Sequence, residues 1–344
     1  MPEGGEVTVI ATTISGSVAD WKKVERIVPL FREHGWDDVV LHAVDSHAEA
    51  RRRTAETVGA GCRRVISAGG SGTFNAVLEG CLDSGVGLGA VRLGFLRKGS
   101  ADLIGKVLGM PDEIEEAVRV FVRSLAADAT VPCDVIRVES RDGDTMPRHL
   151  VGYGGAEIFG RIPHYTENRF IKYYKGILGQ LFGDLGPFFV GASLAALEKT
   201  LKRPFRGRRV WSVRVDGDER AQGRYQAFIL VNGDLGPNLP FARGVPLGSG
   251  DFHLFGLRDL GVPKLPGQFR RAFDSTIAED PQRWGFEGWR VTESLELAPG
   301  DPRPFPVNRD GSTMLCQGAA RFSIVDQVRL MSRGRTAGGA DEGG

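Results

Sequence analysis

Three glycines within four residues, in the segment 64–80 (RVISAGGSGTFNAVLEG), have the spacing of an anion-binding turn. Residues 65–67 are typical of the end of a buried strand, and residues 74–82 carry apolar side chains at helical spacing. A strand, a glycine turn and a helix in this order can bind phosphate, because the turn lets the backbone approach an anion and the first N–H groups of the helix point at it. The alternative is a tight turn that binds no ligand. The residues predicted to bind phosphate are Gly69, Gly70, Ser71, Gly72 and Thr73.

The elements around this turn alternate between short apolar runs and amphipathic segments, which is typical of a parallel sheet with helical connections. The first run, VTVIA at 7–11, is apolar throughout, as expected of a strand buried on both faces. Asp45-Ser46 has the residue types of a helix cap. Strands are predicted at 7–11, 39–43, 65–67 and 87–92, and helices at 18–34, 47–58, 74–82 and 112–125.

The pattern changes near Asp134, where apolar and polar residues begin to alternate as in antiparallel strands. An apolar helical segment at 170–201 interrupts this pattern. Strands are predicted at 134–139, 149–158, 210–215, 225–232 and 322–330, with a hairpin turn at 141–144. The length suits two domains, so we predict an α/β domain at 1–132, a β-rich domain at 133–332 and a disordered tail at 333–344.

Composition narrows the class of protein. A net charge of +1, with 41% hydrophobic and 25% charged residues, favours a globular protein over one that binds nucleic acid by bulk charge. Four widely spaced cysteines predict buried reduced thiols and a cytoplasmic location. Neither a signal sequence nor a membrane span is predicted. The basic cluster at 202–209 is either a solvated face or a contact with anionic lipid headgroups.

The segment 64–80 resembles the G-G-D-G-T turn of the diacylglycerol kinase, sphingosine kinase and bacterial lipid kinase family, whose usual form is close to VVAGGDGTLNEVVNG. The resemblance extends weakly from about Val7 to Leu330 and is strongest at 65–80. It implies a Rossmann-like nucleotide-binding domain followed by a β-sandwich-type substrate domain. It also implies ATP and Mg²⁺ as cofactors, a lipid as the substrate, and peripheral contact with the inner face of the membrane.

The resemblance also implies site residues outside the turn. Ser15 keeps the end of the family's N-P-x-S-G turn, and Gly99, Ser100 and Asp102 fall in its P-L-G-T-x-N-D-F segment. Asp310 keeps the acid of the family's V-x-x-D-G-E motif. We therefore predict Ser15, Gly99 and Ser100 at the nucleotide and Asp102 and Asp310 in catalysis, while the metal ligands stay unassigned.

Four family carboxylates are replaced in this chain, at Ser71, Ala76, Ser249 and Ser312. Serine cannot act as a general base near neutral pH, and a lost base costs roughly 10²–10⁴ in rate. Two hypotheses follow: an ATP-dependent lipid kinase with a rearranged set of acids, or a degenerate kinase-fold protein that binds nucleotide or lipid without phosphoryl transfer. An NAD kinase is a third reading, which the two-domain layout disfavours. The sequence identifies neither the lipid nor the oligomeric state, although dimers are common among relatives.

Overall fold

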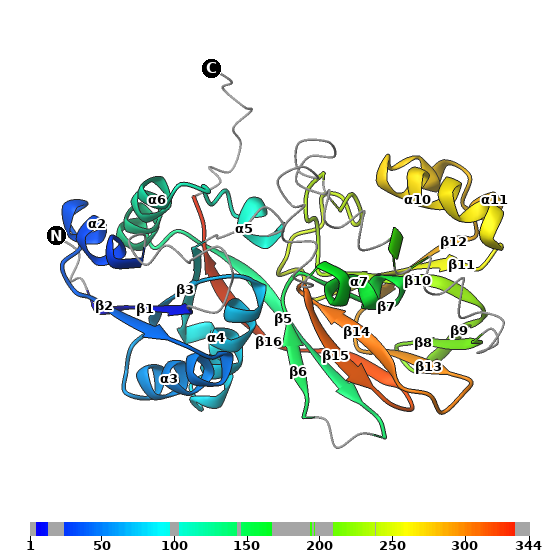
Figure 1. The fold of residues 1–344 in the computed structure, drawn as a ribbon, viewed down its shortest axis with the longest axis horizontal. Helices are drawn as coiled ribbons and strands as arrows, with labels where there is room; N and C mark the ends of the chain where they lie inside the picture. Colours follow the sequence, from blue (N-terminus) through cyan, green and yellow to red (C-terminus); the bar gives the residue numbers. More distant parts are fainter. Residues whose placement is uncertain are drawn as a thin grey trace. The chain divides into compact units, whose positions relative to one another are not determined.

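The chain folds into two compact units, each described here by itself (Figure 1). The computed structural model describes residues 5–12, 24–96, 103–142, 146–166, 193–194, 196, 209–237 and 239–333. The first unit holds residues 1–133 and 326–344, and the second holds residues 134–325. Strands β5 (Thr130–Ser140) and β16 (Ala320–Met331) contribute residues to both units. The predicted domain limits, 1–132 and 133–332, stay a prediction.

The first unit is built on a parallel sheet with the strand order β2-β1-β3-β4-β16. Every residue of β1 is buried, which explains its continuous apolar sequence. Helices α3 and α4 cover one face of this sheet, and α2 and α6 cover the other (Figure 1). The elements are β1 (Val7–Thr12), α2 (Ile27–Glu33), β2 (Val39–Val44), α3 (His47–Gly59), β3 (Arg64–Ala68), α4 (Ser71–Asp83), η1 (Leu88–Ala90), β4 (Arg92–Leu96), α5 (Leu103–Val107) and α6 (Ile114–Ala127).

Most predicted elements of this unit are present, and the predicted cap is confirmed because the Ser46 hydroxyl accepts a hydrogen bond from the Glu49 amide at 3.1 Å. The strand predicted at 87–92 was wrong. Leu88–Ala90 form η1, and the strand β4 runs from Arg92 to Leu96. Burial does not explain the shift, since Leu88 and Val91 are as buried as Leu93. The strand follows the parallel pairing with β3, whose partners run from Arg92 to Leu96.

Close packing of α3 against α4 depends on Gly80. A Cβ at this position would lie 2.4 Å from the Arg51 carbonyl oxygen and 2.7 Å from Thr54 Cβ. Each residue of α4 from Thr73 to Cys81 is buried, so the helix has little room to shift. Beside this contact, Arg51 Nε donates to Asp83 at 2.5 Å.

We expect Gly80→Ala to lower the free energy of unfolding by about 2 kcal/mol, because overpacking against backbone exceeds the gain in helix propensity. Gly59→Ala is the matched control, since its nearest neighbour would be the Ser84 carbonyl oxygen at 4.0 Å. The control should be neutral or stabilising by up to ~1 kcal/mol. Urea denaturation of both variants measures the difference, and a Gly80→Ala protein as stable as the control would contradict the packing argument.

The second unit contains two antiparallel arrangements of strands. One sheet has the order β12-β11-β10-β7-β14-β15, and the other runs β16-β13-β8-β9, with β5 pairing both β16 and β6. The strands are β6 (Arg148–Leu150), β7 (Tyr153–Glu157), β8 (Trp211–Val215), β9 (Asp218–Gly223), β10 (Tyr225–Val231), β11 (Phe252–Arg258), β12 (Phe286–Val291), β13 (Leu295–Pro299), β14 (Phe305–Arg309) and β15 (Ser312–Cys316). The helical elements are α7 (Ile158–Thr166), η3 (Val262–Lys264), α10 (Leu265–Phe273), η4 (Thr276–Glu279) and α11 (Pro281–Trp284).

The core of this unit combines buried side chains from both sheets. Trp211 of β8 lies edge-on to Phe228 of β10 and Phe305 of β14, with ring centroids 5.4 and 4.9 Å apart. Side chains of two sheets that interdigitate in this way define a β-sandwich. The predicted fold class, an α/β sheet followed by a β-sandwich-type unit, is therefore confirmed.

The strand predicted at 149–158 was wrong as a single element. It is divided into β6 and β7, and the amides of Val151 and Gly152 between them donate to a carboxylate instead of a sheet partner. The predicted helical segment 170–201 and most of the basic cluster 202–209 lie outside the described residues. Arg209 of that cluster is described, and it pairs with Asp301 at 2.8 Å. No helix in the described part of the chain is long and apolar enough to cross a membrane.

Candidate active site

The glycine turn joins the carboxyl end of β3 to the first residue of α4. Gly70 is the N-cap, with φ −88° and ψ −174°, and its carbonyl accepts from the Thr73 and Phe74 amides at 3.0 and 3.1 Å. The helix begins at Ser71, three residues earlier than predicted, and no side chain caps it. Because the first amides of a helix have no intrahelical acceptor and carry positive partial charge, this end of α4 suits an anion.

Small residues and buried hydroxyls fix the shape of the turn. A Cβ on Gly69 would lie 2.3 Å from Thr73 Oγ1, so only glycine fits there without a shift. Thr73 is fully buried, and its hydroxyl lies 2.5 Å from the Thr12 hydroxyl at the end of β1. The turn is therefore tied to the neighbouring strand, which keeps its backbone in one place for a ligand.

His47 lies against this turn and was not predicted as a site residue. Its ring would be 2.7 Å from a Cβ on Gly72. The Ser46 cap starts α3 directly after β2, and the carboxyl ends of parallel strands share one edge of a sheet. The order of the strands brings the first residues of α3 and α4 close together. No local sequence pattern predicts this proximity, which is why His47 was not expected at the turn.

The residues of the turn fit a phosphate group, because the glycines leave the backbone open and the helix start is uncapped. The other predicted nucleotide contacts, Ser15, Gly99 and Ser100, lie outside the described residues, as does Asp102. Within the described ranges, no group of three or more His, Cys, Asp or Glu side chains is arranged to hold a metal ion. The structure therefore leaves the predicted nucleotide site a prediction, and gives no ligand set for Mg²⁺ within those ranges.

In the second unit, Asp310 is held in a buried turn. Its carboxylate accepts hydrogen bonds from the amides of Val151 (2.7 Å), Gly152 (2.9 Å) and Tyr153 (2.8 Å). Its own amide donates to the Tyr153 carbonyl at 2.8 Å, and its φ of 46° is left-handed. Burial raises the pKa of Asp310 to about 6, although the three amide donors act in the opposite direction. Asp310 therefore fastens the β14–β15 turn to the segment between β6 and β7, and its predicted catalytic role stays a prediction.

A hydrogen-bond network gathers the other segments that resemble the family around the same backbone. Asn232 Nδ2 donates to the carbonyls of Asp134 (2.7 Å) and Val151 (2.8 Å). The Gly250 amide donates to the Asp134 carboxylate at 2.7 Å. The stretches near 151–157, 232–251 and 307–312 are thus brought together within the second unit.

Serines occupy two acidic positions of these motifs. Ser249 donates to the Asp251 carboxylate, which also accepts from Arg290 Nε. Burial would raise the pKa of Asp251, but the serine hydroxyl and the guanidinium lower it below its usual value. Ser312 lies opposite Arg309 at the start of β15. Asp251 is therefore the ion-pair partner of Arg290 in this arrangement.

Glu157 also has an observed structural contact. Its carboxylate accepts from the Trp211 indole N–H at 2.8 Å, and its φ is 60°. Trp211 is fully buried in the sandwich core. Glu157 thus links the end of β7 to the core residue of β8.

An apolar cavity lies against the face of the six-stranded sheet that carries Ala227 and Ile229 of β10. Alternate residues of β10, such as Phe228 and Leu230, point into the sandwich core, so the opposite face would normally be polar. Here it is covered by α7, α10 and the loop after β10. The walls include Phe159, Ile162, Ile229, Phe241 and Phe269. Such a cavity favours an apolar ligand.

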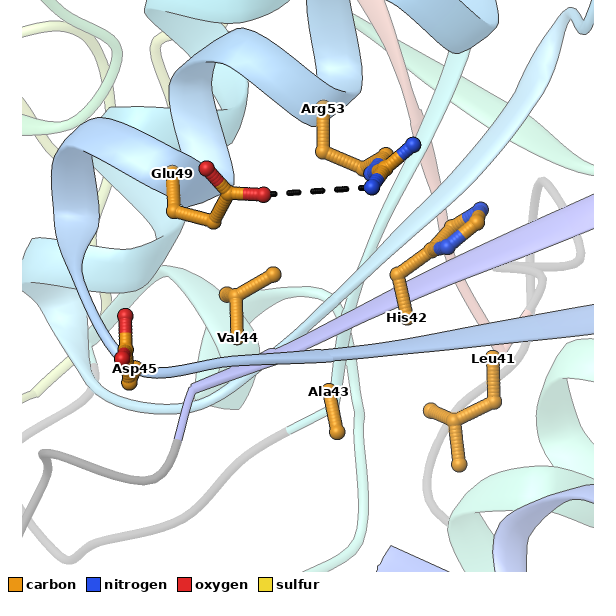
Figure 2. A pocket seen from close by; sticks show the side chains of 7 residues that line it. All are labelled: Leu41, His42, Ala43, Val44, Asp45, Glu49 and Arg53. Carbon is orange, nitrogen blue, oxygen red and sulfur yellow. Dashed lines mark ion pairs between the residues drawn. The ribbon is translucent and has the colours of Figure 1, made fainter.

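A polar pocket lies elsewhere, along the edge strand β2 and the first turns of α3 (Figure 2). Its lining includes His42 and an ion pair between Glu49 and Arg53, whose atoms are 3.9 Å apart. Burial and the charge of Arg53 lower the pKa of His42. Because both signs of charge line this pocket and no residue of the glycine turn does, it has little selectivity for phosphate.

Solved structures of other proteins share the fold of this chain. Three solved structures from Bacillus anthracis str. Sterne share the fold over 95% of this chain and 96–97% of theirs, with TM-scores of 0.62–0.65 and 14–15% identity. One is described as a diacylglycerol kinase, and two are provisionally assigned as diacylglycerol kinases. At this identity the likeness establishes the fold alone.

The sequence itself matches a family model. Residues 6–138 match the diacylglycerol kinase catalytic domain, which confirms the resemblance predicted from the glycine turn. No curated protein sequence matches the chain. The match ends at the strand β5, where the chain passes into the second unit.

Proposed function

We propose that this protein is a lipid kinase, which transfers the γ-phosphoryl group of ATP to a hydroxyl group of a lipid such as diacylglycerol or a sphingoid base. The observation that carries the proposal is the uncapped start of α4 after Gly69 and Gly70, within the part of the chain that matches the catalytic domain. Amides of this turn hold the phosphates, together with Ser15, Gly99 and Ser100. The protein acts in the cytoplasm at the inner face of the membrane.

The apolar cavity of the second unit supports a lipid acceptor. Its described walls are aliphatic and aromatic, which favours an acyl chain over a polar acceptor such as NAD. The space between these walls is about 20 Å³, less than an acyl chain occupies, so the walls must move apart to admit one. Mg²⁺, when bound with ATP, neutralises charge on the phosphates. Asp102 and Asp310 are the proposed catalytic acids, and the Asp310 hydrogen bonds hold the backbone of residues 151–153 in position.

A second candidate function is binding of nucleotide or lipid without phosphoryl transfer. One observation favours it: the Asp310 carboxylate is engaged by three backbone amides. In addition, serine stands at positions 249 and 312, where the resemblance implies acids. Loss of negative charge at Ser71 would favour anion binding while removing a contribution to catalysis.

A transfer assay distinguishes the two. The full chain is incubated with γ-labelled ATP, Mg²⁺ and detergent micelles that contain diacylglycerol, a sphingoid base, monoacylglycerol or phosphatidylglycerol, with NAD as a further acceptor. Binding of ATP is followed in parallel by thermal shift. A labelled lipid supports the kinase, stabilisation by ATP without labelled product supports the binding protein, and labelled NAD would contradict both.

Restoring two carboxylates is expected to raise phosphoryl transfer if their loss limits catalysis. In Ser71→Asp/Ser312→Glu, one acid returns to the first residue of α4 and the other to the start of β15. We expect a gain of about 10²-fold in kcat, within the range of a general base. Each single variant is the control, and circular dichroism checks the fold. A folded double variant with unchanged kcat would contradict the explanation.

A further inference from the structure

Three cationic side chains surround one indole ring in the second unit. The Arg271 guanidinium carbon lies 5.0 Å from the centroid of Trp284, Lys264 Nζ lies at 5.6 Å and the Arg283 guanidinium carbon at 5.7 Å. All three distances are within the range of cation–π attraction. Lys264 ends η3 and is the N-cap of α10, Arg271 lies in α10, and Arg283 and Trp284 lie in α11. Figure 1 shows α10 and α11 close together beside β11 and β12. We call Leu260, Lys264, Arg271, Arg283 and Trp284 the basic-aromatic surface.

Local packing fixes the position of Trp284. A Cβ on Gly267 would be 2.8 Å from the indole, so the ring lies directly across α10. Buried Gln268 donates from Nε2 to the carbonyls of Trp284 (2.8 Å) and Arg258 (2.9 Å), which ties α11 to β11 through α10. The ring is therefore held in place before any partner binds.

The three cations of this surface take no part in the ion pairs that the described residues form. Within the described ranges, Lys264, Arg271 and Arg283 have no carboxylate oxygen at ion-pair distance. The nearby acids bond locally instead: Asp274 accepts from the amide and hydroxyl of Thr276, and Asp280 accepts from the Arg283 amide. The Asp274 carboxylate still interacts electrostatically with Arg271. Three cations held close together, with no ion pair in the described part of the chain, favour an anionic partner.

The surface also has an apolar component. Leu260 is 39% exposed, and its side chain would lie 3.4 Å from a Cβ on Gly285, the residue after Trp284. Proteins that bind the surface of a bilayer often combine indole and leucine side chains with lysine and arginine. The aromatic rings insert at the level of the headgroups, and the cations attract anionic lipids. A purely electrostatic partner would not require the exposed apolar side chain.

Helix α10 connects this surface to the apolar cavity. Phe269 and Ala272 of α10 line the cavity, while Arg271, between them in sequence, contacts Trp284. One face of α10 therefore lines the cavity, and another belongs to the basic-aromatic surface. A bilayer bound at this surface would lie beside α10, the helix that covers the cavity.

We infer that the basic-aromatic surface docks the second unit on an anionic lipid bilayer, so that a lipid can pass to the cavity beside α10. The proposed partner is the membrane surface itself. Its phosphatidylglycerol-type headgroups would lie next to the cations, and the indole would lie at the depth of the headgroups. The inference rests on the proposed lipid substrate, but docking requires neither ATP nor phosphoryl transfer.

Vesicle binding of the full chain tests this directly. Sedimentation is measured with vesicles of phosphatidylcholine alone and with vesicles that contain phosphatidylglycerol. We expect binding only to the second kind, weaker at high salt, and about thirtyfold weaker for Lys264→Glu/Arg283→Glu, since each basic residue adds roughly fivefold. Arg220→Glu/Arg321→Glu is the matched control, with the same change of charge on exposed residues of β9 and β16. An equal loss in the control, or no loss in the test pair, would overturn the assignment.

Tryptophan fluorescence tests the depth of the ring. Vesicles with brominated acyl chains should quench the wild-type protein, and Trp284→Phe, which retains an aromatic ring for packing, should lose most of that quenching. Unchanged quenching in Trp284→Phe, or equal binding to a polyanion such as heparin and to vesicles, would place the contact elsewhere or identify a different partner. Phosphoryl transfer to a short-chain lipid in detergent is measured separately, so failure of docking and failure of the kinase give different results.

Discussion

Asp310→Asn is expected to lower the free energy of unfolding of the second unit by about 3 kcal/mol. The Asp310 carboxylate accepts from three backbone amides while almost fully buried. An asparagine offers one acceptor oxygen and places an NH₂ group against the amide that loses its partner. A buried donor without an acceptor costs about 1–3 kcal/mol, and bonds to a charged group are stronger than neutral ones.

The chain provides a matched control for this prediction. Asp216 also accepts from three consecutive amides, those of Thr292, Glu293 and Ser294, but at the protein surface. Water can replace a lost partner there, so Asp216→Asn should cost only about 1 kcal/mol. Urea denaturation followed by tryptophan fluorescence measures both variants. Equal losses in the two would show that burial does not control the effect.

The same variant separates structure from catalysis. If Asp310 only holds residues 151–153, the folded fraction of Asp310→Asn should keep its rate of phosphoryl transfer within a few-fold. If Asp310 also contacts the reacting hydroxyl, kcat per folded molecule should fall by about 10²-fold or more. The folded fraction is taken from the denaturation curve at the assay temperature.

The parallel sheet could be predicted because its signal is local. The apolar run of β1, the Ser46 cap and the glycines before α4 each specify their element within a few residues. The strand predicted at 87–92 was wrong because residues 87–91 are almost as apolar as β4, and Leu88 and Val91 are just as buried. Only the pairing of Arg92–Leu96 with β3 distinguishes the two stretches, and that pairing is not a local signal.

The site of the second unit could be predicted only in part. The resemblance selected Asp310 and the stretches near residues 157 and 249, but no local pattern indicates that the Asp310 carboxylate accepts the amides of residues 151–153, more than 150 positions earlier. The basic-aromatic surface could not be predicted for the same reason, because it is formed by residues distant in the sequence. Lys264 and Trp284 are 20 residues apart, and only the packing of α11 on α10 brings them together.

Gly69→Ala is expected to weaken ATP binding at least tenfold. A methyl group at this position would lie 2.3 Å from Thr73 Oγ1 and 2.7 Å from Thr73 Cβ, well inside contact distance. Thr73 cannot yield easily, because it is fully buried and its hydroxyl lies 2.5 Å from the Thr12 hydroxyl. The backbone of the turn must move instead, which takes the amides at the start of α4 out of line with the phosphates.

Gly87→Ala is the control for this experiment. Gly87 has φ −57°, and no atom lies within 4 Å of its added Cβ, so ATP affinity should not change. Isothermal titration calorimetry with ATP and Mg²⁺ gives Kd for the wild type and both variants, and thermal unfolding without ligand shows whether the fold is retained. A folded Gly69→Ala protein with wild-type Kd would place the phosphates away from this turn. Since the turn is the part of the site that both candidate functions share, that result would contradict the kinase and the nucleotide-binding protein alike.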